Sequence, residues 1–146
     1  MTVIPNVSEL IARAIIIDNE KILLCKSKKR GHYFLPGGHV EFGEKTEEAL
    51  KREFIEETGS EVKIGKFVGA FENIFGQEQK YHEVCLVFTA SLLHSDKEIV
   101  SKEDHIEYAR VGKEEFASSN FLPKFMKEVV LNFWTNNETF WVSEAD

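Results

Sequence analysis

Apolar runs separated by short polar turns predict β-strands near the beginning of the chain. Residues 11–17 are mostly apolar and β-branched, a composition that is typical of a strand. A polar turn at 18–20 follows, and residues 21–25 are apolar again. This pattern predicts a strand and its returning partner.

The same criteria predict further strands in the middle of the chain. A short strand at 33–35 is expected to end at Gly37 and Gly38, because glycine adopts backbone angles that side chains forbid. Residues 94–104 are polar and predict a loop. The remaining predicted strands are two long ones around a glycine-containing turn and a short one after the loop: 62–75, 81–93 and 106–111.

Two segments predict helices. The first covers 46–58, with Thr46 as its N-cap, acidic residues in its first turn and Gly59 at its end. The second starts near Asn120, with Pro123 in its first turn, because apolar residues recur at helical spacing and predict a face that packs on the core. These residues are Leu122, Phe125, Met126, Val129, Val130 and Phe133.

Strands on both sides of a central helix, followed by a terminal helix, indicate a mixed α/β sandwich. The segment after Phe133 contains Trp134, Phe140 and Trp141. We leave two interpretations open for these aromatic residues. They form an interface between two copies of the chain in a homodimer, or they fold back as a last strand.

The composition restricts the class of protein. The chain has 146 residues, of which 42% are hydrophobic and 29% charged, so residues 1–146 are expected to form a single folded domain. No apolar segment has the length of a membrane span or the pattern of a signal peptide. Cys25 and Cys85 lie in apolar runs and are expected to be buried thiols, which makes the cytoplasm the expected compartment.

The net charge restricts the molecules that the protein is expected to bind. Eighteen basic and 25 acidic residues give a net charge of −7, so the chain lacks the positive surface of a nucleic-acid-binding protein. A phosphorylated small molecule would be repelled by such a protein unless a divalent cation neutralised the charge locally.

Acidic residues cluster on one face of the first predicted helix. At 100° per residue, Glu53, Glu56 and Glu57 share an arc of about 100°. Their carboxylates repel one another, and a hard cation such as Mg²⁺ or Mn²⁺ would relieve that repulsion. The glycine turn at 36–38 can bring main-chain groups to the same point, and Glu44 can add a carboxylate. An acidic motif of this length is by itself usually a solvated helix face, so the whole arrangement carries the prediction.

The segment Gly38-x5-Glu44-x7-Arg52-Glu53-Phe54-Ile55-Glu56-Glu57-Thr58-Gly59 resembles the Nudix box. The lead-in from Phe34 to Glu41 is also similar to that family. One position departs, because Ser60 stands where the family has a bulky apolar residue, and Val62 could supply that contact. The resemblance implies an α/β/α sandwich with a mixed sheet and hydrolysis of a nucleoside diphosphate linked to another moiety.

The resemblance also implies roles for individual residues. Glu53, Glu56 and Glu57 would bind Mg²⁺ with the carbonyl of Gly38, and Arg52 would orient the carboxylates by bidentate pairing. The catalytic residues would be Arg52, Glu53 and Glu57, with Glu53 as general base. Some members of the family use an acidic loop residue instead, which here is Glu98, Glu103 or Asp104, and we favour Glu103.

The substrate is less well specified. A nucleobase could stack on one of four aromatic residues: Phe34, Phe71, Phe75 or Tyr81. Gly37 and Glu44 are also expected at the substrate. Residues 75–78 lack the proline or tyrosine that is typical of the ADP-ribose and diadenosine-polyphosphate subclasses. The alternative to an enzyme is a Nudix-fold domain that binds or senses a nucleotide without turnover. Because all four glutamates of the box are present, catalysis is favoured.

Overall fold

Two β-sheets form the middle of the protein in the computed structural model, which describes residues 2–145. The larger sheet is mixed: β1 runs parallel to β7, whereas β6 runs antiparallel to it. Its five strands, in spatial order, are β5 (Gly37–His39), β1 (Val7–Ile15), β7 (Tyr81–Leu92), β6 (Val62–Phe75) and β9 (Phe140–Ala145). The smaller sheet has four strands, with β3 pairing to β2, β4 and β8: β2 (Ile17–Asp18), β3 (Lys21–Ser27), β4 (Tyr33–Phe34) and β8 (Ile106–Gly112).

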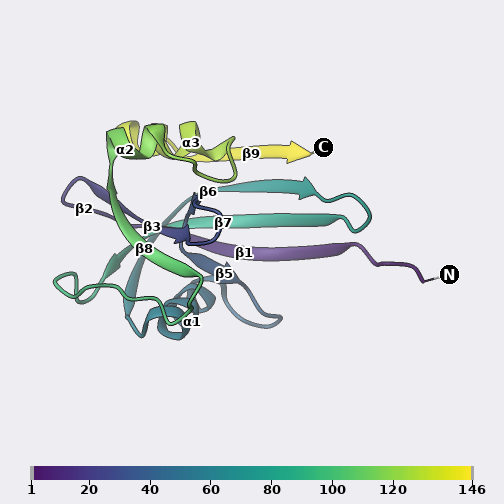
Figure 1. The fold of residues 1–146 in the computed structure, drawn as a ribbon, viewed down its shortest axis with the longest axis horizontal. Helices are drawn as coiled ribbons and strands as arrows, with labels where there is room; N and C mark the ends of the chain where they lie inside the picture. Colours follow the sequence, from purple (N-terminus) through teal and green to yellow (C-terminus); the bar gives the residue numbers. More distant parts are fainter. Residues whose placement is uncertain (1, 146) are drawn as a thin grey trace.

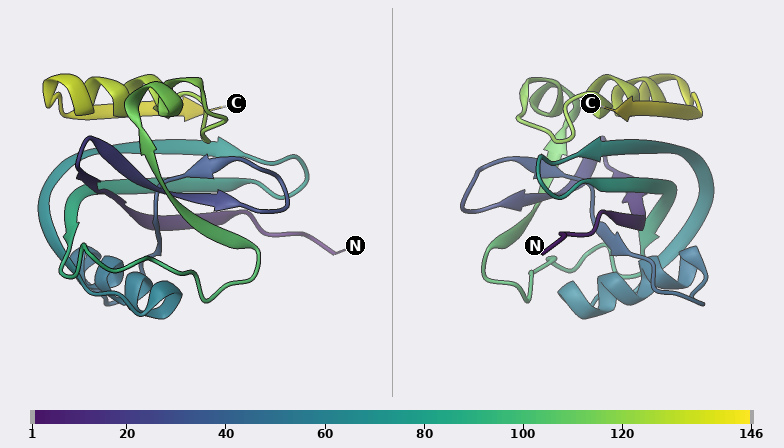
Figure 2. Two further views of the ribbon diagram at one scale, coloured as in Figure 1. Left: turned by 60° about the vertical axis from the view of Figure 1, so that its left-hand side comes forward. Right: turned by 90° about the vertical axis from the view of Figure 1, so that its right-hand side faces the viewer.

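Helices cover the sheets from two sides, as Figures 1 and 2 show. Helix α1 (Thr46–Thr58) lies on one side and packs Leu50 and Phe54 into an apolar cluster. Helices α2 (Lys113–Ser118) and α3 (Met126–Asn136) lie on the other side, where a second apolar cluster joins them to both sheets. The predicted α/β/α sandwich with a mixed sheet is confirmed.

Helix α1 has the predicted length, but its N-cap is one residue earlier. Lys45 occupies the cap position with extended backbone angles and without a side-chain hydrogen bond, so the prediction of Thr46 as the N-cap was wrong. At the other end, Gly59 has a φ of 72° and donates its N–H to the carbonyl of Ile55. Val62 is buried in the same cluster as Phe54, where it makes the apolar contact that Ser60 does not.

The prediction that the strand signal ends at Gly37 and Gly38 was wrong. These glycines begin strand β5, which pairs antiparallel with β1 so that Gly37 lies opposite Arg13 and Gly38 opposite Ala12. Gly37 has a φ of 142°, and a Cβ there would overlap the backbone of β1. Glycine is therefore required at this point by the close approach of two strands.

The terminal helix begins later than the apolar spacing indicated. Helix α3 starts at Met126, because residues 120–122 are held by strand β4: the N–H of Tyr33 donates to the carbonyl of Asn120, and the N–H of Leu122 donates to that of Tyr33. Its buried face carries Met126, Val130 and Phe133, as predicted.

The aromatic tail forms strand β9, which runs parallel to β6 and places Phe140 opposite Gly69. The interpretation as a last strand is thus confirmed for Phe140 and Trp141 but not for Trp134, which lies in helix α3. The homodimer stays a prediction. Both cysteines are free and buried. No helix among residues 2–145 has the length and apolar character needed to cross a membrane.

Candidate active site

The Gly38–Gly59 motif brings strand β5 and helix α1 into direct contact. The carboxyl group of Glu53 occupies the space beside Gly38 that a side chain would fill, since a Cβ at Gly38 would overlap it. Glycine at this position therefore lets the first acidic residue of the helix reach the main chain of β5.

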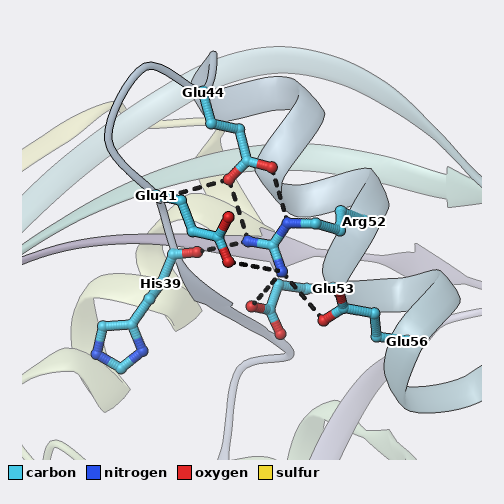
Figure 3. A network of polar contacts seen from close by, with 6 residues as sticks. All are labelled: His39, Glu41, Glu44, Arg52, Glu53 and Glu56. Atoms are coloured by element: carbon cyan, nitrogen blue, oxygen red, sulfur yellow. Dashed lines mark hydrogen bonds and ion pairs between the residues drawn. The ribbon is translucent and has the colours of Figure 1, made fainter.

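Arg52 holds the acidic residues around it in place (Figure 3). Its Nε and one terminal nitrogen donate to the two oxygens of Glu44 at 2.7 and 3.0 Å. Its other terminal nitrogen donates to Glu53 at 3.2 Å and to Glu56 at 3.0 Å. A further bond reaches the carbonyl of His39 at 2.9 Å. The hydrogen bonds from Arg52 hold the pKa of Glu44 below its usual value, so Glu44 stays ionised.

A small cavity of about 280 Å³ has three acidic residues in its wall, and one of them, Glu53, also accepts a hydrogen bond from Arg52. Glu53 and Glu57 line it from helix α1, and Glu103 lines it from the loop before β8. That loop is anchored to the helix, because the N–H of Lys102 donates to the carbonyl of Glu57 at 2.7 Å. Gly37 and Gly38 complete the acidic end of the cavity.

Burial and neighbouring negative charges both affect the pKa of Glu57. Burial is the largest cause that raises its pKa, which reaches about 7, and the charges of Glu53 and Glu103 raise it further. A hydrogen bond from the hydroxyl of Tyr108, 2.8 Å from Oε2 of Glu57, acts in the opposite direction. Partial protonation at neutral pH is therefore expected for Glu57 when no cation is bound.

A larger cavity of about 660 Å³, mostly apolar and with five phenylalanines in its wall, adjoins the acidic one, and we call it the aromatic cavity. Arg13 and Phe34 line both cavities and so mark their boundary. Glu83 faces the larger cavity, and burial together with Glu9, its neighbour across β1 and β7, raises its pKa. Five phenylalanines of the wall come from strand β4, strand β6 and the segment before helix α3: Phe34, Phe71, Phe75, Phe121 and Phe125.

The structure brings most of the predicted site residues together, but not all of them. The acidic cavity is lined by six of these residues: Phe34, Gly37, Gly38, Glu53, Glu57 and Glu103. Phe71 and Phe75 line the larger cavity. Within the described part of the chain, four candidates lie outside the walls of both cavities: Arg52, Glu44, Glu56 and Tyr81. Glu44 and Glu56 are turned toward Arg52. Tyr81 stacks on Phe75 with ring centroids 5.3 Å apart and donates its hydroxyl to Gln79.

Two of the three loop acids are likewise absent from the cavity walls. Glu98 and Asp104 line neither cavity among residues 2–145, whereas Glu103 lines the acidic one. The position of Glu103 agrees with our preference for it, and its catalytic role stays a prediction.

Arg13 and Tyr108 are site residues that the sequence did not single out as such. Arg13 carries the one charge in an otherwise apolar strand segment, and a charge at such a position was the signal that could have identified it. Tyr108 lies in an ordinary short strand, 51 residues from its partner Glu57, and no local pattern marks it.

The donors of the acidic cavity fit a hard divalent cation. Carboxylates of Glu53, Glu57 and Glu103 and the main chain of Gly38 supply oxygen, and the raised pKa of Glu57 shows the negative charge that a cation would relieve. Among residues 2–145, no three histidine, cysteine or acidic side chains already stand in the geometry of a metal site. Glu56 would have to leave its contact with Arg52 to become a ligand.

Comparisons with known proteins show the family to which this chain is similar. Residues 9–133 match the NUDIX domain family model. The chain is 35% identical over 113 residues to an ADP-ribose pyrophosphatase of Methanocaldococcus jannaschii. The aligned region covers 75% of this chain and 62% of that protein. It is 34% identical over 67 residues to a putative 8-oxo-dGTP diphosphatase of Bacillus subtilis, covering 46% of this chain and 45% of that one. The chain thus spans less than two thirds of the length of these curated relatives.

Solved structures share the fold at lower sequence identity. A NUDIX hydrolase from Nitrosomonas europaea superposes with a TM-score of 0.73 at 20% identity, covering 94% of this chain and 79% of that one. A MutT protein from Methanosarcina mazei Go1 gives a TM-score of 0.73 at 23% identity, covering 92% and 98%. At these identities the likeness concerns the fold alone.

Proposed function

Because the chain belongs to the Nudix family, we propose that it is a metal-dependent hydrolase that cleaves the diphosphate linkage of a nucleoside diphosphate derivative. The observation that carries the proposal is the convergence of Glu53, Glu57 and Glu103 in one cavity beside Gly38. The adjoining aromatic cavity has room for a nucleobase or another planar group.

Nudix hydrolases generally use a divalent metal ion, and we infer that this one uses Mg²⁺, with Mn²⁺ as a substitute. Glu53, Glu57 and the carbonyl of Gly38 would hold it, and Glu56 would join them after release from Arg52. When bound, the ion would offset the negative charge of the phosphates and make a nearby water more acidic.

The residues of the chain then have separate tasks. Glu53 accepts the proton of the water whose oxygen bonds to phosphorus, while the bond from phosphorus to the leaving phosphate oxygen breaks. Glu103 faces the same cavity and is the second candidate for this base. Arg52 acts through Glu44, Glu53 and Glu56 by fixing their carboxylates, so its role is positioning.

The substrate is a small phosphorylated molecule and, in our proposal, a nucleotide. The named relatives act on different molecules: ADP-ribose in one case, 8-oxo-dGTP in another, and diphosphoinositol polyphosphates in a rat protein that is 33% identical over 81 residues. A match of the family model over residues 9–133 supports the single domain. Two buried free thiols support the cytoplasmic location.

A substrate screen tests the proposal. The full chain is incubated with Mg²⁺ or Mn²⁺ and nucleoside triphosphates, dinucleoside polyphosphates, ADP-ribose, nucleotide sugars or diphosphoinositol polyphosphates, and the products are identified by mass spectrometry. We expect release of a nucleoside monophosphate, and Glu57→Gln should lower kcat by roughly a hundredfold or more. Glu47→Gln, an exposed change in the same helix, is the matched control.

The screen also separates catalysis from simple binding. A nucleotide that raises the melting temperature without yielding any product would contradict the hydrolase and support a binding or sensor domain.

A further inference from the structure

Arg13 lines the acidic cavity and Arg52 contacts Glu53 in its wall, and these two arginines differ in what neutralises their charge. Arg52 donates hydrogen bonds to the carboxylates of Glu44, Glu53 and Glu56. Arg13 is half-buried on strand β1, and its recorded hydrogen bond goes to a main-chain carbonyl, that of Leu35, at 3.1 Å. Within residues 2–145, Arg13 has no carboxylate partner within 4.0 Å.

The guanidinium group of Arg13 is held in a defined place. Its carbon Cζ lies 5.8 Å from the centroid of the Phe34 ring, and the bond to Leu35 ties one terminal nitrogen to the start of the glycine turn. Gly37 lies opposite Arg13 in the pairing of β5 with β1. Arg13 is therefore attached to the same backbone segment that carries Gly38 beside Glu53.

Arg13 stands at the boundary between two cavities of different character. The smaller cavity is acidic, with Glu53, Glu57 and Glu103 in its wall, whereas the larger one is mostly apolar and has five phenylalanines in its wall. Arg13 and Phe34 line both. A substrate that occupies both cavities must pass these two side chains.

Glu83 is the acidic residue in the wall of the larger cavity, and among residues 2–145 it forms no ion pair with Arg13 within 4.0 Å. Glu83 feels the charge of Arg13, but burial and the neighbouring Glu9 raise its pKa above the usual value. The Glu83 carboxyl therefore carries less negative charge than an ordinary exposed carboxylate at the same pH.

A half-buried cation without a counterion has lost part of its hydration and gained no ion pair in return. The guanidinium group has five N–H donors in a planar fork that matches the oxygens of a phosphate. We propose that Arg13 binds a phosphate of the substrate at the boundary of the two cavities, so that the diphosphate enters the acidic cavity and the planar group enters the aromatic one. This inference rests on the proposed function for the identity of the substrate.

Binding of a nucleotide and its nucleoside tests the inference without turnover. Dissociation constants of adenosine 5′-monophosphate and adenosine are measured by calorimetry with EDTA present, so that no metal contributes. We expect the wild-type chain to bind the monophosphate at least tenfold more tightly, and Arg13→Gln to lose most of that preference while its affinity for adenosine stays within twofold. Arg110→Gln, an exposed change on strand β8 outside both cavities, should keep the full preference.

A second variant and a salt series distinguish loss of the phosphate contact from loss of folding. Arg13→Lys retains the charge but not the planar fork, so its preference for the monophosphate should fall between those of wild type and Arg13→Gln. Raising the salt concentration should weaken binding of the monophosphate to the wild type and leave adenosine unaffected. An unchanged preference in Arg13→Gln, or a preference that salt does not alter, would overturn the inference.

The two proposals fail in different ways. If the wild-type chain hydrolyses a nucleotide in the screen but Arg13→Gln keeps the full preference, the role of Arg13 is wrong and the hydrolase stands. If the preference depends on Arg13 but no substrate is cleaved, the phosphate site stands and the hydrolase is wrong.

Discussion

The hydroxyl oxygen of Tyr108 lies 2.8 Å from Oε2 of Glu57 and joins strand β8 to helix α1. The hydroxyl is the donor, so it fixes one carboxylate oxygen while Glu57 also faces the acidic cavity. This bond lowers the pKa of Glu57, whereas burial raises it. Tyr108 is thus a positioning residue that favours the ionised form of a candidate metal ligand.

Removal of the Tyr108 hydroxyl should weaken metal binding. In Tyr108→Phe the pKa of Glu57 rises above its present value of about 7, because the opposing hydrogen bond is lost. A hydrogen bond to a charged group contributes about 1–2 kcal/mol at a partly exposed position, so the Mg²⁺ concentration for half-maximal activity should rise roughly five- to thirtyfold. Tyr81→Phe, which removes the 2.8 Å bond to Gln79, is the control. Equal Mg²⁺ requirements in both variants would contradict this role.

The stability of the metal-free protein should depend on pH through Glu57. Its pKa is raised from 4.5 to about 7, so folding favours the protonated form, and the associated stability is fully present below about pH 4.5 and is lost as pH rises through 7. Because Glu57 is partly exposed, we expect a loss on the order of 1 kcal/mol. Urea denaturation with EDTA between pH 5 and 8 should show this fall in wild type and not in Glu57→Gln. Parallel curves for the two proteins would contradict it.

Gly38→Ala should separate activity from stability. The new Cβ would overlap the carboxyl of Glu53, the far end of a flexible side chain that can move aside at little cost to folding. We expect the melting temperature to change by only a few degrees and kcat to fall by roughly a hundredfold, because Glu53 leaves its position. Gly112→Ala adds its methyl group to open space and should retain activity. Full activity in Gly38→Ala would argue against Glu53 as ligand and base.

Gly69→Ala, in contrast to Gly38→Ala, should lower the stability of the fold. A Cβ at Gly69 would lie 2.5–2.6 Å from carbons of the Phe140 ring, which packs on the core from strand β9. Overpacking of this kind costs about 1–3 kcal/mol. Thermal unfolding should therefore show a lower melting temperature than in Gly112→Ala. If the two variants melt alike, Phe140 does not pack against strand β6 as described.

Local signals identified the elements whose residues interact with near neighbours in sequence. The periodicity and the terminating Gly59 defined helix α1, and its box spacing placed Glu53 and Glu57 on one face. The long strands β6 and β7 also followed from their composition. Helix α2 was missed, because six residues with Phe116 as their one buried side chain carry little periodic signal.

The errors came from contacts between distant segments. Residues 120–122 have the apolar spacing of a helix, but hydrogen bonds to Tyr33 hold their backbone against strand β4. Gly37 and Gly38 signalled a break, yet they form a strand because β1 approaches too closely for a side chain at Gly37. In both cases a partner far along the chain decided the conformation.

The sequence by itself determined the mixed α/β class, the box helix and its acidic face, because the spacing of residues along one strand or helix depends on neighbours in the chain. The family resemblance added the α/β/α arrangement. Only the tertiary structure decided that Glu53 and Glu57 line the acidic cavity, whereas Glu44 and Glu56 contact Arg52 outside it. It also placed Arg13 and Tyr108, since strands β1 and β8 reach the site only once the sheets are assembled. The physical reason is that side-chain direction depends on packing between elements, which no local pattern records.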